Sequence, residues 1–171
     1  ISEMKQIQRK RHDEEREAII TELQTTLHFL NQSIRGIMGG IVSCNMNDPI
    51  GKAAQVMNSK NTSAVLIASE KGRYIGMVTD QAIRERAVAK GVDLNHPVVE
   101  IMSAPIRMIS DNALVFETAM EMQDKGVDHI AVHDGSGQIT GVISCLDLLR
   151  IQGYSAVSLL QSIQRSHTVN E

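Results

Sequence analysis

The sequence predicts an α/β (α+β) fold, in which two β-α-β-β-α repeats pack as a pseudo-twofold pair behind a long N-terminal helix. From about residue 40 onward the apolar pattern returns when the chain is shifted by 65 residues without a gap, so that Gly76 falls on Gly141. Within each copy, short apolar runs typical of buried strands alternate with stretches of helical periodicity. Ahead of the repeats, residues 2–17 carry opposite charges four positions apart, which is typical of a solvated helix.

The N-terminal helix continues into an apolar seam with alternating spacings of three and four. The seam lasts about two and a half heptads, so either packing along a domain surface or a dimer contact can explain it. Gly39-Gly40 is expected to end this helix, and we place an N-terminal linker helix at 1–38. The seam residues are Ile20, Leu23, Leu27, Leu30, Ile34 and Ile37.

The two repeats are expected at 39–95 and 96–152, followed by a C-terminal linker helix at 153–171. Each repeat reads as strand, helix, strand, turn, strand and helix; in the first, Asp48 is expected to cap a helix that begins at Pro49. A unit of roughly 55 residues with three short strands buries too little apolar surface to be stable alone. We therefore expect the two repeats to share a core.

Composition excludes several function classes. The net charge of −3 is too close to neutral to suggest nucleic acid or an acidic membrane surface as a partner, and no apolar run is long enough to span a bilayer. Cys44 and Cys145 form no C-x-x-C pair and the histidines show no ligand spacing, so we expect no metal and a reduced, cytoplasmic setting. Because the chain begins at Ile1 and not at Met, we expect a longer parent protein.

The most specific motif is Gly141-Val142-Ile143-Ser144-Cys145-Leu146-Asp147, a glycine, two apolar strand residues, Ser, two residues and Asp. With this motif, the repeated unit over about residues 36–152 resembles the CBS domain pair, also called a Bateman module. The flanking segments VTDQAIRERAVAKGVD and LLRIQGYSAVSLLQSIQ resemble bacterial proteins that carry a cyclic-nucleotide-binding-like domain, a CBS pair and a nucleotidyltransferase similar to the enzymes that uridylylate the PII protein. The resemblance implies a regulatory module without catalytic residues of its own.

Ser144 and Asp147 permit two interpretations. Ser144 lies where a strand ends and a helix begins, so its hydroxyl and the first helical N–H groups can form an anion site. Asp147, one turn later, can accept hydrogen bonds from the two hydroxyls of a ribose. Alternatively, Ser-x-x-Asp is a variant of the capping box, and the pair only caps the helix. The family resemblance favours ribose binding.

The first repeat departs from this motif, because Thr79 matches Ser144 but Ala82 takes the place of Asp147. In CBS pairs each cleft combines elements of both repeats, so the resemblance implies one intact and one degenerate cleft, and we expect one working site per chain. The intact cleft is expected to contain Ser43, Ser63, Ala64, His129 (near the phosphates), Ser144 and Asp147. The degenerate cleft is expected to contain Thr79, Ala82, Met108 and Asp128.

Two functions are consistent with these observations. The first is a sensing module that binds an adenine nucleotide such as AMP, ADP or ATP between the repeats and controls an attached domain, for which the resemblance suggests a nucleotidyltransferase. The second is a non-binding scaffold that dimerises and spaces neighbouring domains. In either case we expect a homodimer, because CBS pairs commonly associate through exposed helices and the apolar seam is too long to leave in water.

Overall fold

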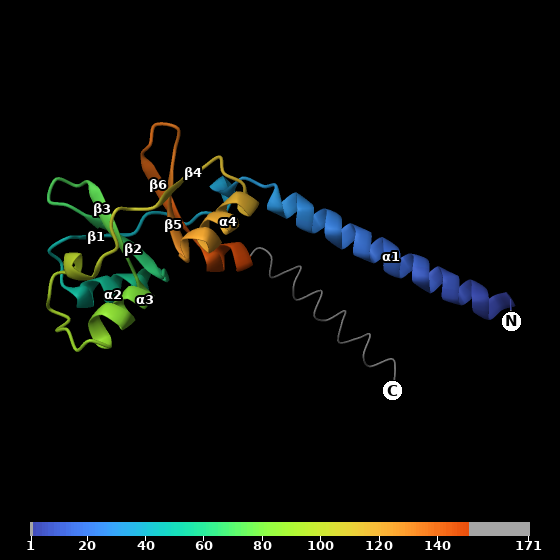
Figure 1. The fold of residues 1–171 in the computed structure, drawn as a ribbon, viewed down its shortest axis with the longest axis horizontal. Coiled ribbons are helices and arrows are strands. Elements are labelled where there is room, and N and C mark those ends of the chain that lie inside the picture. The colour runs from blue at the N-terminus through green and yellow to red at the C-terminus, as the bar shows by residue number, and fades with distance from the viewer. Residues whose placement is uncertain (1, 151–171) are drawn as a thin grey trace.

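The computed structural model describes residues 2–150 of the 171-residue chain, and it confirms a long helix followed by two copies of one mixed α/β unit (Figure 1). The expected C-terminal linker helix at 153–171 lies outside the described residues. The long helix is α1 (Ser2–Leu30). The first repeat contains β1 (Ser43–Asn45), α2 (Ile50–Lys60), β2 (Ala64–Ala68), β3 (Tyr74–Thr79), α3 (Asp80–Ile83) and a π-helical turn (Arg84–Val88). The second repeat, after a 3₁₀ turn (Val98–Ile101), contains β4 (Met108–Ser110), α4 (Val115–Lys125), β5 (His129–His133), β6 (Ile139–Ser144) and a helix whose described part is 145–150.

Each repeat builds a three-stranded sheet with the same strand order and the same register. β1 runs parallel to β2 and β2 runs antiparallel to β3, and β4, β5 and β6 repeat this arrangement. Ser43 pairs with Leu66, and 65 residues later Met108 pairs with Ala131. The ungapped repeat in the sequence is therefore an ungapped repeat in the structure.

The two sheets pack against each other and form a core that belongs to both repeats. Leu66 and Met77 of the first sheet meet Ala131 of the second, and all three side chains are buried. Each repeat also has a core of its own between its sheet and its helices. The shared core adds the apolar burial that one small unit lacks, which is the physical reason for the pairing.

The segment that precedes each repeat docks on the sheet of the other repeat. Gly39, ahead of the first repeat, exchanges two backbone hydrogen bonds of 2.9 and 3.2 Å with Val142 of β6. Ser103, ahead of the second repeat, exchanges two of 3.0 and 2.8 Å with Met77 of β3. A Cβ on the motif residue Gly141 would collide with the carbonyl oxygen of Gly39, so the crossing backbone requires glycine at this position.

The N-terminal helix ends earlier than the sequence pattern indicates, which corrects the predicted linker helix at 1–38. α1 ends at Leu30, and a 3₁₀ turn (Ile34–Gly36) follows in place of a helix that continues to Gly39-Gly40. The Ile34 N–H donates to the Ala113 carbonyl at 3.0 Å, so the backbone here bonds to the second repeat rather than to the preceding helical turn. These tertiary hydrogen bonds outweigh the helical periodicity of the seam.

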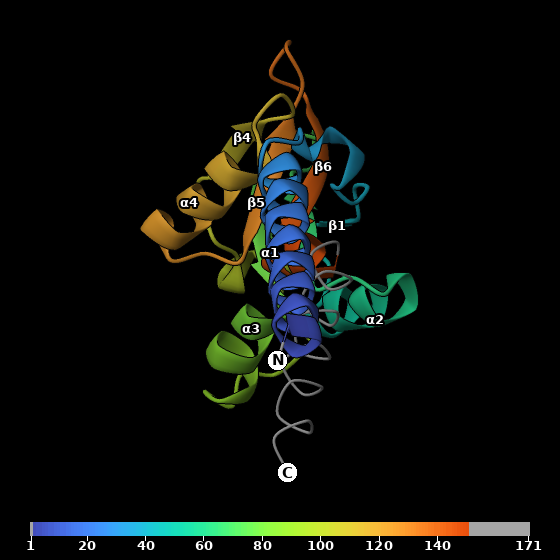
Figure 2. The same cartoon turned by 90° about the vertical axis from the view of Figure 1, so that its right-hand side faces the viewer.

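The apolar seam is divided by this early helix end. Ile20, Leu23 and Leu27 are 53%, 58% and 59% exposed on α1, whereas Ile34 is fully buried in the core of the second repeat. α1 leaves the body beside α4 and projects from it as a single rod (Figures 1 and 2). Within residues 2–150, no helix combines the length and the apolar character that crossing a membrane requires.

The second helix begins one residue later than predicted. Pro49 is its N-cap residue, and the Asp48 side chain makes no capping hydrogen bond to the helix. Its carboxylate instead accepts the Asn45 N–H at 2.9 Å and pairs with Lys52 at 2.9 Å. Asp48 therefore closes the turn between β1 and α2.

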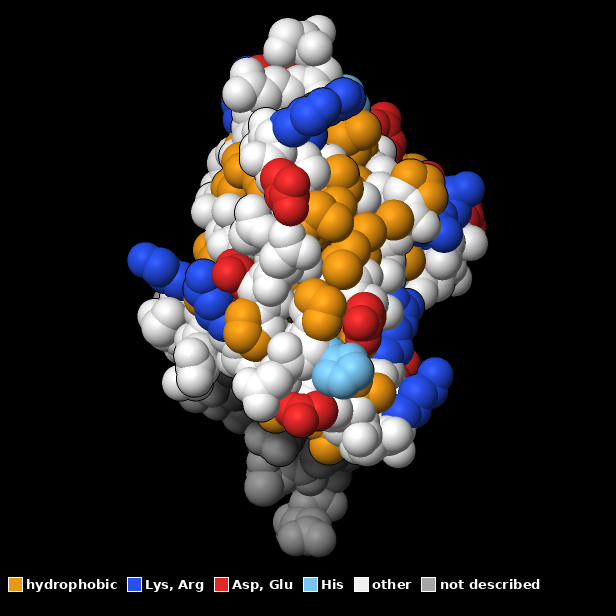
Figure 3. All heavy atoms as spheres, turned by 90° about the vertical axis from the view of Figure 1, so that its left-hand side faces the viewer, with side chains coloured by type: hydrophobic (Ala, Val, Ile, Leu, Met, Phe, Trp, Pro, Cys, Tyr) orange, Lys and Arg blue, Asp and Glu red, His pale blue; other side chains and the backbone are white. Residues whose placement is uncertain are grey.

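The face of the body turned away from α1 carries charges of both signs. Lys and Arg side chains lie among Asp and Glu side chains around a central apolar patch (Figure 3). A surface that binds nucleic acid is typically basic over a continuous area. This face has no such continuous basic area.

The link between α1 and the second repeat includes a buried carboxylate, Asp111. Arg35 reaches it from the 3₁₀ turn through Nε at 3.2 Å, and the Asp111 side chain is only 12% exposed. We expect Arg35→Met to lower the free energy of unfolding by about 1–3 kcal/mol, because a buried carboxylate would lose its charged partner. Urea denaturation measures the change. Arg84→Met is the control, since this guanidinium meets Glu85 at 3.8 Å on the exposed surface; an equal loss in both variants would contradict the prediction.

Candidate functional site

Two cavities lie between the repeats. The first, of about 650 Å³, is lined by α2, the start of β2 and α3 from the first repeat, and by the end of β6 and the helix after it from the second. The second, of about 530 Å³, is lined by the end of β3, α3, the start of β5 and the segment ahead of β4. Both volumes are in the range of small-molecule sites. The two cavities are related by the internal repeat. The end of the last strand and the following helix come from the second repeat in the first cavity, and from the first repeat in the second cavity.

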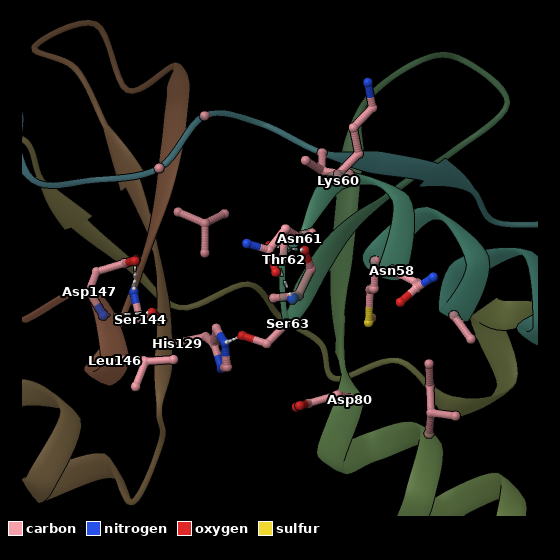
Figure 4. A pocket seen from close by; sticks show the side chains of 18 of the residues that line it. Asn58, Lys60, Asn61, Thr62, Ser63, Asp80, His129, Ser144, Leu146 and Asp147 are labelled. Atoms are coloured by element: carbon pink, nitrogen blue, oxygen red, sulfur yellow. Dashed lines mark hydrogen bonds between the residues drawn. The ribbon is translucent and has the colours of Figure 1, made fainter. Parts of the chain in front are cut away.

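Ser144 and Asp147 form a reciprocal cap at one wall of the first cavity (Figure 4). The Asp147 N–H donates to Ser144 Oγ at 3.0 Å, and the Ser144 N–H donates to Asp147 Oδ2 at 2.9 Å. The two side chains therefore do cap the helix, and this cap by itself does not exclude a ligand at the same carboxylate. Two amide groups expected to attract an anion already have partners. The cap takes the Asp147 N–H, and separately the Cys145 N–H donates to the Asp128 carbonyl at 2.8 Å. Ribose binding would depend on the other carboxylate oxygen, Oδ1.

Ser63 and His129 join the two repeats across the cavity. Ser63 Oγ lies 2.7 Å from His129 Nε2, and Figure 4 shows the pair between the Asp147 wall and Asp80. Burial lowers the pKa of His129 below its usual value, an effect that the nearby carboxylates of Asp80, Asp128 and Asp147 partly oppose. Burial thus favours the neutral imidazole. His129 lines both cavities, so a ligand in either one meets the same side chain.

Ala64 contributes its backbone to the first cavity. The Leu66 N–H donates to the Val42 carbonyl on the β1 side of β2, and residues two apart on a strand direct their backbone groups to the same side. The N–H and C=O of Ala64 therefore also point to the β1 side. There the chain does not continue as a paired strand, because the segment at Gly39 has left to dock on β6. Ala64 thus directs one donor and one acceptor toward the cavity, and no neighbouring strand pairs with them.

Ser43 and Met108 are placed differently from the prediction. Both side chains are exposed, and neither belongs to the lining of its expected cavity. The preceding residues, Val42 and Arg107, line the first and the second cavity instead. Side chains alternate between the faces of a strand, so an error of one residue moves a side chain to the other face. We therefore correct the lining to Val42 and Arg107.

The second cavity contains the other predicted residues of the degenerate cleft. Thr79, Ala82 and Asp128 all line it. Thr79 Oγ1 accepts the Ala82 N–H at 3.1 Å, which is one half of the cap made by Ser144 and Asp147. Ala82 has no side chain that could complete the cap or accept a ribose hydroxyl. The second cavity therefore keeps one half of the cap but has no carboxylate at the position equivalent to Asp147.

Several cavity residues lie outside the motif and carry no distinctive sequence signal. Asp80 enters both cavities and faces His129, although it precedes the motif position that Ala82 occupies. Asn58 and Thr62 come from α2 and the loop after it. Ala54, also on α2, is exposed and lines the first cavity. The residues at the strand-to-helix junction could be identified from the sequence motif, whereas residues such as Asn58 and Thr62 belong to no motif.

The family model for the CBS domain matches the chain twice, over residues 34–89 and 98–154. The chain belongs to the CBS-domain family. The two matches correspond to the two structural repeats, and the first begins at Ile34, the residue buried in the second core. The predicted CBS pair is therefore confirmed, and CBS-domain pairs are generally regulatory rather than catalytic.

Individual relatives agree with this family. CBS domain-containing protein YhcV of Bacillus subtilis is 26% identical over 129 residues, which cover 74% of this chain and 91% of YhcV. Protein MK0525 of Methanopyrus kandleri is 24% identical over 113 residues, or 66% of this chain, and this region spans only 58% of MK0525.

Two solved CBS structures show the same fold. PAE2072 of Pyrobaculum aerophilum, solved in complex with AMP, is 24% identical with a TM-score of 0.62, covering 68% of this chain and 89% of its own. The CBS domain pair of MJ0100, solved with 5′-methylthioadenosine and S-adenosyl-L-methionine, is 21% identical with a TM-score of 0.63, covering 71% and 96%.

Proposed function

We propose that this chain is a cytoplasmic, non-catalytic regulatory module that binds one adenosine-containing ligand, of the adenine nucleotide class, in the first cavity. The observation that carries the proposal is the intact pair Ser144 and Asp147 in this cavity, against Thr79 and Ala82 at the equivalent positions of the second. Asp147 Oδ2 holds the helix cap, while Oδ1 can accept the ribose hydroxyls. His129, beside Ser63, would lie near the phosphate or other 5′ group.

The backbone of Ala64 supports adenine as the base. An N–H donor next to a C=O acceptor matches an adenine edge, which offers an acceptor ring nitrogen next to the N6 amino donor. Guanine offers O6 and N7, two acceptors, on the corresponding edge, and one of them would face the Ala64 carbonyl. The apolar side chains of Val42, Ala54 and Met57 line the same cavity and can contact the faces of a purine ring. The ligands solved with PAE2072 and the MJ0100 pair contain this base.

Regulation would follow from the position of the cavity between the repeats. A ligand that contacts both repeats changes their relative arrangement only if it binds one arrangement more tightly than another. The proposed contacts fall on both repeats, with Ser63 and Ala64 on one side and Ser144 and Asp147 on the other. We propose that the attached domain so controlled is a nucleotidyltransferase, with a cyclic-nucleotide-binding-like domain elsewhere in the longer parent chain.

We propose a homodimer that uses α1 and the helices of the second repeat. Ile20, Leu23 and Leu27 are exposed on α1, which leaves the body beside α4 (Figure 2). The second repeat also exposes large apolar side chains where the first repeat, 65 residues earlier, carries smaller or polar ones. These pairs are Phe116 and Gly51, Met120 and Gln55, Leu146 and Gln81, and Leu149 and Arg84. Because the two repeats are otherwise similar, the extra exposed apolar side chains of the second repeat indicate that this repeat makes a contact with a partner.

Titration calorimetry tests the ligand proposal. AMP, ATP, S-adenosylmethionine and 5′-methylthioadenosine are titrated separately into the full chain, with GMP as the control. We expect at least one adenosyl compound to bind with about one site per chain, and GMP to bind far more weakly. At about 100 times its dissociation constant, the ligand should add about 2.7 kcal/mol to the free energy of unfolding. Two equal sites would contradict the single-site proposal, and binding by none of the adenosyl compounds would favour the scaffold function.

A further inference from the structure

Thr62 lies directly in front of the backbone edge that Ala64 presents to the first cavity. Its hydroxyl oxygen is 3.3 Å from the Ala64 carbonyl, to which it donates, and 3.5 Å from the Ala64 nitrogen, whose N–H it accepts. The hydroxyl therefore supplies one donor and one acceptor to this edge. An adenine edge would supply the same pair.

Both contacts of the Thr62 hydroxyl are long for hydrogen bonds, and each is correspondingly weak. They are nevertheless intramolecular, so the hydroxyl competes for the edge without the entropy loss of binding from solution. The loop geometry keeps it there: Asn61 ends α2 in the left-handed conformation, and the Thr62 N–H donates to the Met57 carbonyl at 3.0 Å. Thr62 and Ala64 are thus held on the same side of the loop that leads into β2.

We propose that the Thr62 hydroxyl occupies the base-recognition edge of Ala64 whenever no ligand is bound and must be displaced by the ligand, so that Thr62 limits the affinity of the site. The inference rests on the proposed function and extends it to a residue outside the CBS motif. When the ligand binds, Ala64 loses its two weak contacts to the Thr62 hydroxyl and gains two shorter hydrogen bonds to the base. Without the hydroxyl, the edge would be covered only by water, which the ligand displaces more readily.

The second repeat shows that this position does not require a hydroxyl for folding. Val127 is the equivalent of Thr62, 65 residues later, and it packs against the core of the second repeat. Its N–H donates to the Met122 carbonyl at 3.0 Å, which is the same loop bond that Thr62 makes. The loop conformation is thus kept with an apolar side chain. A small apolar residue at position 62 should therefore leave the fold intact.

The proposal is tested with Thr62→Ala and Thr62→Ser. Alanine removes the competing hydroxyl, and serine keeps it as the matched control. We expect Thr62→Ala to lower the dissociation constant for AMP and for 5′-methylthioadenosine about three- to tenfold, the effect of one modest hydrogen bond, and Thr62→Ser to bind within about twofold of the unmodified chain. The gain should be equal for both compounds, because they share the base and differ at the 5′ position.

A second readout follows the Ala64 amide directly. In the nuclear magnetic resonance spectrum, the Ala64 N–H resonance should shift when the ligand binds, and its hydrogen exchange in the empty protein should be faster in Thr62→Ala than in the unmodified chain. Weaker binding by Thr62→Ala would show that the hydroxyl holds the ligand, and unchanged binding would show that it does not compete; either result overturns the proposal while leaving the function intact. Binding of no adenosyl compound to any variant would overturn the proposed function itself, and this inference with it.

Discussion

Replacing Asp147 with asparagine should weaken the binding of the adenosyl ligand at least about tenfold, or about 1.4 kcal/mol. Asparagine keeps one side-chain oxygen that can accept the Ser144 N–H, so the helix cap survives. Its amino group takes the place of the oxygen that would accept the ribose hydroxyls, and an amino group cannot accept them. Calorimetry measures the affinity, and the midpoint of urea denaturation shows that the fold persists.

Asp124→Asn is the matched control for this experiment. It makes the same change of charge on α4, where Asp124 is exposed and outside the linings of both cavities. The control should bind like the unmodified chain. If Asp147→Asn also binds within about twofold, Asp147 only caps the helix, and the assignment of the ribose to this carboxylate is wrong.

A chain that carries both Leu23→Glu and Leu27→Glu should be a monomer at micromolar concentration, whereas the unmodified chain should be a dimer. The two leucines lie one turn apart on α1 and are 58% and 59% exposed. In the isolated chain the new carboxylates remain in water, so the fold is unaffected. In the proposed dimer they would be buried without partners, which costs several kcal/mol. Light scattering measures the mass of each form.

Ile7→Glu is the control for this pair, since Ile7 is 59% exposed on the same helix but lies in the charge-dense part that shows no apolar seam. This variant should remain a dimer. If the Leu23→Glu, Leu27→Glu chain is still a dimer, α1 is not the dimer contact. Another surface, such as the apolar patch on the opposite face (Figure 3), would then have to form it. A monomeric mass for the unmodified chain would end the dimer proposal.

The repeated fold could be predicted because each strand and helix leaves a local mark that recurs in both copies. Ala64–Ala68, for example, is a continuous apolar run, and it forms strand β2. Thr79 and Ser144 could be identified as caps because each lies at a strand-to-helix junction, where its hydroxyl accepts a backbone N–H only three residues further along the chain. In these cases the interactions that decide the structure lie within a few residues of sequence.

The errors concern residues whose placement depends on distant parts of the chain. α1 ends at Leu30 because the backbone that follows it bonds to Ala113 and Val115. These residues lie about 80 positions away in sequence, so helical periodicity cannot reveal the contact. Ser43 was predicted to line the cavity in place of Val42, because the sequence does not define the start of the strand to within one residue. Thr62 was missed because its role depends on the unpaired edge of Ala64, which exists only after the segment at Gly39 has crossed to β6.

α1 is attached to the second repeat, although the first repeat follows it directly in sequence. A movement of α1 is therefore coupled first to the second repeat. Ile34 and Arg35 tie the base of the rod into the second repeat, through its core and through Asp111. A helix of 29 residues is about 43 Å long, so a rotation of the second repeat by about 10° about an axis perpendicular to α1 would move the far tip of α1 by about 8 Å. α1 is thus anchored on the repeat that carries Asp147. If ligand binding rotates this repeat, as the proposed regulation requires, the tip of α1 moves much further than the cavity itself.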